Sequence, residues 1–178
     1  MRVIGGEFRS RRLKTLPGLG TRPTPDRLRE TLFNILAPRI ADAVFVDAYA
    51  GTGAVGIEAL SRGAARCIFL ERSKAAVDVI RDNLHALGIT EHANVVVGKV
   101  LVSLGRQRAD IIFLDPPYNM ETEYASALAE AHAPLVIAQH SVRFDPGETH
   151  GPLRRSRVVR QGDNALSFYS GSTDFSCS

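Results

Sequence analysis

The sequence predicts a single α/β domain built on a doubly wound, mostly parallel sheet with helices on both faces. Two stretches, residues 44–53 and 110–119, each contain an apolar run of strand length that ends at an acidic residue and opens into a turn. Along most of the chain, such runs alternate with amphipathic segments of helical length, as in βαβ units. With 178 residues, 44% of them hydrophobic, the chain is long enough for one core and short for two.

Composition excludes several classes of protein. No run approaches the roughly 18 consecutive apolar residues of a membrane span, and the basic start of the chain is not that of a signal peptide, so we expect a cytoplasmic protein with no membrane partner. Cys67 and Cys177 form neither a disulfide framework nor a metal-ligand spacing. We therefore expect no metal and interpret Cys67 as a small buried hydrophobe.

The net charge of +3 is distributed unevenly. Residues 1–39 hold nine basic and three acidic side chains, a balance of +6, which leaves the other residues at −3. The basic residues concerned are Arg2, Arg9, Arg11, Arg12, Lys14, Arg22, Arg27, Arg29 and Arg39. This asymmetry indicates a basic arm that contacts a polyanion, most plausibly nucleic acid. We expect residues 1–21 to form a basic extension, residues 22–171 the core, and residues 172–178 a frayed tail.

Residues 1–15 alternate loosely between apolar and basic positions, so we expect a short hairpin or an irregular extension. Its arginines would face phosphates; the alternative is a charged edge that only prevents aggregation.

A helix should follow this extension, with Thr24 as its N-cap, Pro25 at its first position and Asp26 next to the positive end of its dipole. Its apolar stripe runs from Leu28 to Leu36, with Arg27, Arg29 and Glu30 largely on other faces, and Pro38 should end it near Ala37.

Residues 44–53, VFVDAYAGTG, are the stretch around which the chain is organised. Asp47 lies near the carboxyl end of the predicted strand, while Gly51 and Gly53 allow the backbone to turn tightly and approach a ligand. A helix over residues 55–62 should end at Gly63. The pattern predicts a nucleotide-type pocket, although a purely structural strand-to-helix turn remains the alternative.

The next strand, residues 67–71, ends at Glu71, 18 residues beyond Gly53. In a doubly wound sheet, an acid at this place hydrogen-bonds ribose hydroxyls; the alternative is an acidic neighbour of the following helix. That helix should begin at Ser73 and end at Gly88. A third strand over residues 94–97 leads to Lys99 and Val100, and residues 101–108 form a short crossover.

Residues 110–119, DIIFLDPPYN, contain a buried strand over 111–114, expected beside the first strand. The two prolines after Asp115 cannot donate backbone hydrogen bonds, so the chain must leave the sheet with the Pro116 carbonyl exposed. The Asp115 carboxylate and this carbonyl are two acceptors suited to an exocyclic amine, and Tyr118 offers a flat face for a base.

The sequence after this motif predicts a helix over 121–131, a strand over 135–138, a loop over 144–153 and an antiparallel pair of strands over 155–160 and 165–170. Its arginines Arg154, Arg155, Arg157 and Arg160 either extend a basic face or line a solvated edge.

Five motifs occur in order: Arg22-Pro23-Thr24, Arg27-x-Arg29-Glu30-x-Leu32-Phe33-Asn34, Asp47-Ala48-Tyr49-Ala50-Gly51-Thr52-Gly53, Gly56-x-Glu58-Ala59-x-Ser61-Arg62-Gly63 and Asp115-Pro116-Pro117-Tyr118. Together they closely resemble the RsmD-type bacterial 16S ribosomal RNA (guanine-N2)-methyltransferases. The resemblance implies a Rossmann-like class I methyltransferase fold with seven strands and a reversed last hairpin. It also implies S-adenosylmethionine as methyl donor and a guanine of small-subunit ribosomal RNA, in a partly or fully assembled particle, as acceptor. We expect the enzyme to be a monomer.

The resemblance assigns roles to individual residues. Asp115, Pro116 and Tyr118 would be catalytic, and Arg9, Arg11, Arg12 and Lys14 would bind RNA. S-Adenosylmethionine would be held by Arg22, Thr24, Asp47, Tyr49, Gly51, Gly53, Glu71, Arg72, Val100 and Asp115. Three features depart from the family pattern: Lys99-Val100, where an acid or Asn often binds adenine; Ala138-Gln139-His140, where an acid is usual at the end of the fifth strand; and a short carboxyl end.

Two alternatives remain open from the sequence. The same acidic-Pro-Pro-aromatic motif serves enzymes that methylate adenine N6 in DNA or RNA. The altered adenine turn also leaves room for a non-catalytic RNA-binding or ribosome assembly factor that keeps the fold.

Overall fold

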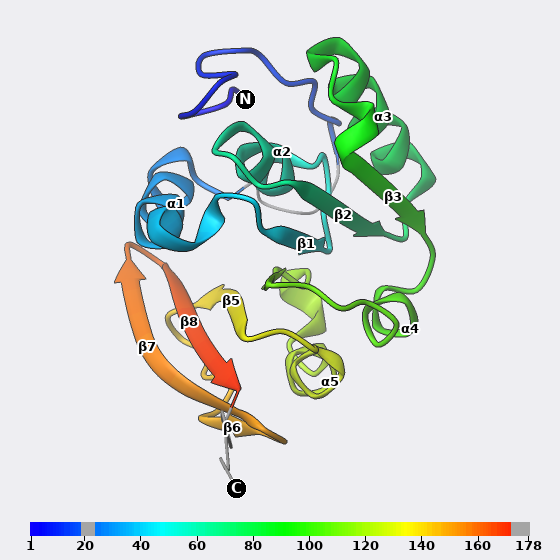
Figure 1. Ribbon diagram of the computed structural model, residues 1–178. Coiled ribbons are helices and arrows are strands. Elements are labelled where there is room, and N and C mark those ends of the chain that lie inside the picture. The colour runs from blue at the N-terminus through cyan, green and yellow to red at the C-terminus, as the bar shows by residue number, and fades with distance from the viewer. Residues whose placement is uncertain (19–23, 172–178) are drawn as a thin grey trace, which may run out of the picture.

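The computed structural model describes residues 1–18 and 24–171, which form one α/β layer structure (Figure 1). Eight strands make one sheet in the order β3-β2-β1-β4-β5-β8-β7-β6. They are β1 (Val44–Ala48), β2 (Arg66–Glu71), β3 (Ala93–Val97), β4 (Ile111–Leu114), β5 (Leu135–Ser141), β6 (Thr149–His150), β7 (Leu153–Gln161) and β8 (Asn164–Gly171). The first five strands are parallel, and β8, β7 and β6 add antiparallel neighbours at one side.

Helices cover both faces of the sheet (Figure 1). On one face, α1 (Asp26–Ile40), α2 (Ala54–Ser61) and α3 (Lys74–Leu87) share a core with one set of strand residues. On the other face, α4 (Val100–Leu104) and α5 (Glu123–Glu130) pack on the alternate set. Because β1 and β4 are covered on both sides, their side chains are nearly all buried, which is why they appear in the sequence as continuous apolar runs.

The order of the strands positions the predicted ligand-binding loops. Strand β1 pairs in parallel with both β2 and β4, so the turns after these three strands open at the same edge of the sheet. Gly56 allows α2 to lie close to β2, because a Cβ at this position would approach the Phe69 ring to 2.3 Å. The expected caps of α3 are confirmed: Ser73 accepts a hydrogen bond from the Ala76 amide, and Gly88 adopts φ 69°.

The sheet has eight strands, one more than expected. The additional strand, β6, lies in the stretch expected to be a loop, and it pairs with the start of β7 at the outer edge. A two-residue strand has no hydrophobic periodicity of its own, so only its neighbour reveals it.

Two expectations for α1 are wrong. Thr24 does not cap the helix: Pro25 is the N-cap, no side chain caps it, and the Thr24 hydroxyl donates to Oε1 of Gln139 at 3.0 Å. Pro38 does not end the helix, which continues to Ile40. Pro38 lies in the last turn on the exposed face, where the carbonyl freed by its missing N–H can be solvated, while the buried Ile40 holds the final turn against the core.

The basic extension is a short hairpin, closed by an antiparallel bridge between Arg2 and Arg12. It lies across α2: the amides of Ile4 and Gly5 donate to the two carboxylate oxygens of Glu58 at 2.9 and 2.8 Å. The expectation that Arg29 faces away from the core is wrong, because its side chain is completely buried beside Glu58. The expected frayed tail, residues 172–178, lies outside the described residues.

Candidate active site

The turn after β1 is shaped by three residues with positive φ. Tyr49, Gly51 and Gly53 have φ values of 61°, 58° and 83°, a region that costs glycine little and tyrosine more. A side chain at Gly53 would also press on Ile80 and Phe69, at 3.2 and 3.3 Å from its Cβ. The turn therefore exposes backbone at the end of the strand, as a ligand-binding loop requires.

Asp47 lies beneath this turn. Its Oδ2 accepts a hydrogen bond from the amide of Gly56, in the first turns of α2, at 2.8 Å. Burial raises the pKa of Asp47 well above its ordinary value, and the nearby carboxylates of Asp115 and Glu71 act in the same direction. A cation bound next to Asp47 would relieve this cost, so the site favours a positively charged group.

Glu71, at the end of β2, is held in place by the backbone. Its Oε2 accepts from the Gly51 amide at 2.8 Å, and its Oε1 accepts from the Ser73 amide at 2.9 Å. Each oxygen keeps a second lone pair for a ligand. The β1 turn and the Glu71 carboxylate are thus locked into one unit before any ligand arrives.

A cavity of about 630 Å³, which we call the large cavity, opens beside this unit. That volume lies within the range of small-molecule and cofactor pockets. Its lining comes from the turns after β1, β2, β3 and β4 and includes Tyr49, Gly51, Glu71, Arg72, Ser73, Lys99, Val100, Tyr118 and Glu123. The Tyr49 hydroxyl donates to Glu123, which ties the β1 turn to α5 across the cavity.

The turn after β4 brings Asp115 to the same edge of the sheet. Burial raises the pKa of Asp115 to about 7, and a contact with the Thr24 hydroxyl opposes the shift. Asp115 lies between two smaller cavities. The inner cavity, of about 90 Å³, is also lined by Thr24, Asp47, Tyr49 and Gly51.

The second of these, the base cavity, has a volume of about 30 Å³. It is lined by Asp115, Pro116, Pro117, Tyr118, Tyr124, Gln139, His140 and Asn164, among others. Tyr118 lines both the base cavity and the large cavity and is 51% exposed. Asp115 is therefore the side chain at which a ligand from the Asp47 side and a ligand from the Tyr118 side would meet.

The protein family described as "Conserved hypothetical protein 95" matches residues 1–170 of the sequence. The chain belongs to this family. Among its curated relatives, "Putative rRNA methyltransferase YlbH" of Bacillus subtilis is 34% identical over 180 residues, covering 95% of this chain and 98% of that protein. "Ribosomal RNA small subunit methyltransferase D" of Escherichia coli is 43% identical over 121 residues, covering 67% of this chain and 61% of that protein. The resemblance to RsmD-type proteins is confirmed.

Solved structures of similar proteins establish the fold class of this chain. "Putative methyltransferase yhhF from Escherichia coli" superimposes with a TM-score of 0.84 at 32% identity, covering 96% of this chain and 97% of that one. An RNA methyltransferase from Salinibacter ruber, solved in complex with S-adenosyl-L-homocysteine, has a TM-score of 0.70 at 18% identity, covering 88% and 98%. The fold is that of the class I S-adenosylmethionine-dependent methyltransferases.

Most of the residues expected from the sequence to bind the cofactor gather at these cavities. Tyr49, Gly51, Glu71, Arg72 and Val100 line the large cavity, and Thr24, Asp47 and Asp115 line the inner one. Gly53 lines neither and shapes the turn instead. Arg22 lies outside the described residues.

Among the lining residues that were not expected from the sequence to belong to the site are Glu123, Gln139 and Asn164. Gln139 accepts the Thr24 hydroxyl and Asn164 accepts the Tyr118 hydroxyl at 3.4 Å, so both touch expected site residues. Gln139 and Asn164 belong to no sequence motif, and the pairing of β5 with the start of β8 brings them to Asp115. In the sequence, the departure from the family pattern at Ala138-Gln139-His140 was the signal that pointed to this part of the site.

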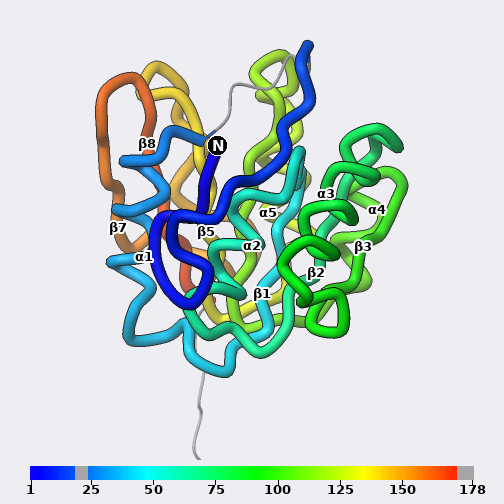
Figure 2. The backbone as a smooth tube through the Cα atoms, turned by 90° about the horizontal axis from the view of Figure 1, so that it is seen from above, coloured from blue at the N-terminus to red at the C-terminus, as the bar shows by residue number. Residues whose placement is uncertain are grey.

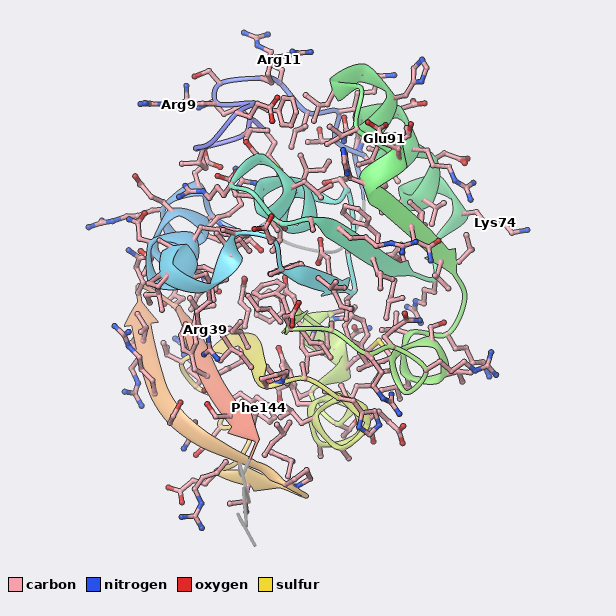
Figure 3. All side chains as sticks on the ribbon, in the orientation of Figure 1. Arg9, Arg11, Arg39, Lys74, Glu91 and Phe144 are labelled. Carbon is pink, nitrogen blue, oxygen red and sulfur yellow. The ribbon has the colours of Figure 1, made fainter. Side chains whose placement is uncertain are left out.

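The four predicted RNA-binding residues lie on the hairpin. All are exposed, and Figure 3 shows Arg9 and Arg11 pointing outward from its rim. Arg11 donates to the Ala86 carbonyl at 3.1 Å, and Lys14 pairs with Asp82 at 3.0 Å. Figure 2 shows that the hairpin lies over α1 and α2 and that the chain then runs toward the carboxyl ends of the strands.

Within residues 1–18 and 24–171, no group of three or more His, Cys, Asp or Glu side chains is placed to hold a metal ion. In the same ranges, no helix has the length and apolar character needed to cross a bilayer.

Proposed function

We propose that this protein transfers the methyl group of S-adenosylmethionine to the exocyclic N2 amine of a guanine in small-subunit ribosomal RNA. The observation that carries the proposal is the position of Asp115, which lies between the inner cavity and the base cavity. Its family relatives named as ribosomal RNA methyltransferases support the choice of RNA and of the small subunit.

The residues present fit the proposed donor. The large cavity has the volume for a nucleoside, and the Glu71 carboxylate, fixed by two backbone amides, offers acceptors to vicinal ribose hydroxyls. The buried Asp47, with its raised pKa, suits the positively charged amino acid end. Val100 is buried and supplies an apolar wall beside the adenine position. The bound donor supplies an electrophilic methyl group on a positively charged sulfur.

Guanine N2 is a poor nucleophile because its lone pair is delocalised into the ring. Two acceptors, the Asp115 carboxylate and the Pro116 carbonyl, would hold its two N–H groups and direct the lone pair toward the methyl group. Pro116 is buried rather than exposed, and it lines the base cavity next to Asp115, which supports its carbonyl as the second acceptor. Alignment of this kind contributes up to ~7–11 kcal/mol in well-oriented systems.

Transfer of the methyl group would break its bond to sulfur, with S-adenosylhomocysteine as the leaving group, and would leave the amine nitrogen with one proton too many. The Asp115 carboxylate is placed to accept that proton, and its pKa of about 7 is close to the value at which a general base is effective near neutral pH. A metal ion and a covalent enzyme intermediate are unnecessary in this scheme.

The target base must leave its stack to reach Asp115. Tyr118, half exposed at the mouth of the base cavity, presents a ring on which the extruded base can stack. Such stacking is worth ~1–3 kcal/mol per base.

The setting of the reaction forms part of the proposal. We place the enzyme in the cytoplasm, acting as a monomer on RNA in a partly or fully assembled small-subunit particle. Supporting the monomer, the large apolar side chains exposed in the described part of the chain are few, namely Val97, Val102, Tyr118 and Val142, of which Tyr118 has a role in the site. The hairpin arginines, far from the cavity mouth, suit an extended RNA surface better than a short oligonucleotide.

The test is transfer from labelled S-adenosylmethionine to three separate acceptors: unmethylated small ribosomal subunits, naked small-subunit RNA and duplex DNA. Labelled N2-methylguanosine from a ribosomal acceptor is the expected product, and the better of the two ribosomal acceptors identifies the natural substrate particle. Labelled N6-methyladenine would move the protein to the adenine methyltransferases. No label, together with no cofactor binding by calorimetry, would indicate a non-catalytic RNA-binding factor.

A further inference from the structure

We propose that an arginine-lined cavity next to the base cavity binds the phosphate backbone of the RNA strand that carries the target guanine. This inference rests on the proposed function for the identity of the polyanion. It concerns Arg143, after β5, and Arg160, near the end of β7, which the family motifs do not include.

The cavity has a volume of about 130 Å³ and forms between the end of β5 and the β7–β8 hairpin. We call it the arginine cavity. It is lined by His140, Arg143, Phe144, Arg155, Val158 and Arg160, together with Val142, Asp145 and Ala165. Figure 3 shows Phe144 near β8 in the lower half of the view and the hairpin residues Arg9 and Arg11 at the top. The cavity is thus separate from the predicted RNA-binding hairpin.

The charges around the arginine cavity are unbalanced. Arg155 is held by Asp145 at 2.6 Å and approaches Glu148 at 4.0 Å, so the two nearby acids both face this one arginine. Arg143 and Arg160 are exposed and have no ion-pair partner within 4.0 Å in the described ranges. Two guanidinium groups therefore remain available to a ligand with negative charge. Guanidinium groups form paired, charge-assisted hydrogen bonds with phosphate oxygens.

The arginine cavity adjoins the base cavity through a common wall. His140 lines both cavities, and its two ring nitrogens are fixed by the Ser141 carbonyl and the Ser167 hydroxyl, each at 2.8 Å. Asn164 lines the base cavity, and the next residue, Ala165, lines the arginine cavity opposite Arg160 in the β-ladder. Because the two cavities share His140 as a wall, the phosphates that flank a base entering toward Asp115 would lie close to the arginine cavity. The geometry therefore favours the RNA backbone next to the target base over an unrelated anion.

Neighbouring arginines on the same strand provide a matched control. Arg154 and Arg157 are exposed on β7 and line none of the cavities described above, and Arg157 lies over the Phe168 ring at 6.0 Å. Substituting this pair removes as much charge from β7 and its surroundings as substituting Arg143 and Arg160. Any difference between the two variants is then due to position.

The experiment measures the affinity for an unmodified small-subunit RNA transcript over a series of salt concentrations, for wild type, R143A/R160A and R154A/R157A. We expect the slope of log affinity against log salt to fall by about 1.4 for R143A/R160A, because each single-strand phosphate contact contributes roughly 0.7. The slope of R154A/R157A should stay near that of wild type. Under turnover conditions, R143A/R160A should raise KM for RNA while leaving kcat and the affinity for S-adenosylmethionine unchanged, and R143K/R160K should recover part of the lost affinity.

An equal loss of RNA affinity in both double variants would overturn the proposed subsite, since it would show a general effect of surface charge. Unchanged RNA affinity in R143A/R160A would overturn it as well. The binding measurement does not require catalysis. A wild-type protein that binds RNA in a manner dependent on Arg143 and Arg160 but transfers no methyl group would refute the proposed function and support the subsite.

Discussion

Arg29 and Glu58 are both completely buried, and Nε of Arg29 lies 3.8 Å from Oε2 of Glu58. The Glu58 carboxylate also accepts the amides of Ile4 and Gly5 and the Nε of Arg62, while Arg29 donates to the Arg2 carbonyl at 2.6 Å. The pair therefore attaches the basic hairpin to α1 and α2. Among the described residues, two Arg29 nitrogens, Nε and Nη1, find no hydrogen-bond partner, and burial lowers the pKa of this side chain. The attachment depends on the charge of Glu58.

The first prediction is that Glu58→Gln destabilises the protein strongly. Without the charge of Glu58, the buried Arg29 keeps only the half-exposed Asp26, at 3.1 Å, as an acidic partner, and breaking a buried ion pair costs ~3–5 kcal/mol. Denaturant unfolding would measure this loss, with Glu91→Gln as the control because the Glu91 side chain is 66% exposed. Equal unfolding free energies for the two variants would show that the Arg29–Glu58 pair does not secure the hairpin.

A second prediction concerns the rate of methyl transfer. Asp115→Asn keeps the shape of the side chain but removes the charge that holds the amine and accepts its proton, so kcat should fall by ~10²–10⁴-fold. The affinity for S-adenosylmethionine should change little, since Glu71 and the β1 turn are untouched. Single-turnover transfer and calorimetry measure the two quantities. Asp163→Asn, an exposed substitution in the β7–β8 turn, is the control. Full activity of the Asp115 variant would eliminate the mechanism.

The third prediction follows from the pKa of Asp115, which burial raises to about 7. Only the carboxylate form accepts both an N–H hydrogen bond and the proton, so kcat/KM should rise with pH and level off above about 7.

The free energy of unfolding should show the opposite trend with pH. Between about pH 4 and pH 7 the folded protein holds a proton at Asp115 that the unfolded chain has released, so unfolding becomes easier as pH rises, by at most ~4 kcal/mol.

Asp115→Asn serves as the reference for both pH trends. Its residual activity should lack the rise near pH 7, and the difference in unfolding free energy between it and wild type should depend on pH over the same interval. A wild-type activity profile that is flat from pH 5 to 8 would be incompatible with Asp115 as the proton acceptor.

A fourth prediction tests the large cavity. Glu71→Ala removes the carboxylate expected to bind ribose hydroxyls and also frees the amides of Gly51 and Ser73. We expect S-adenosylmethionine to bind more weakly by ~1.5–3 kcal/mol, the usual range for hydrogen bonds to a charged group. Calorimetric titration measures the change, with Glu91→Ala as the control at an exposed site. Unaltered affinity would place the ribose elsewhere.

The parts of the fold that could be predicted are those in which local sequence and burial agree. The run Ile111–Leu114 is buried on both faces, so its strand bounds are the predicted ones. Ser73 and Gly88 cap α3 because side chain and backbone preferences decide both ends locally. Asp47, Glu71 and Asp115 were placed at one edge of the sheet because the carboxyl ends of neighbouring parallel strands converge there.

The parts that could not be predicted depend on contacts between distant residues. Arg29 was expected on an outer face of α1, since nothing in its own helix indicates that Glu58, on α2, will pair with it. Thr24 has the residue type of an N-cap, but its hydroxyl bonds to Gln139, which is 115 positions away. The strand β6 and the roles of Gln139 and Asn164 in the site likewise depend on pairing with the last hairpin.

The fifth prediction concerns the hairpin as an RNA-binding element. Arg9, Arg11 and Arg12 are exposed on a segment that the Arg29–Glu58 pair fixes to the core, so their charges have a defined position relative to the active site. Replacing all three with Ala should weaken RNA binding and lower the salt slope by roughly 2, while the affinity for S-adenosylmethionine stays unchanged. The matched control replaces Arg39, Arg66 and Arg108, exposed arginines outside the hairpin that lie in the last turn of α1, at the start of β2 and before β4. Since both triple variants lose the same charge, a larger effect of the hairpin variant identifies a surface that contacts RNA, whereas equal slopes would reduce the hairpin to a solvated edge.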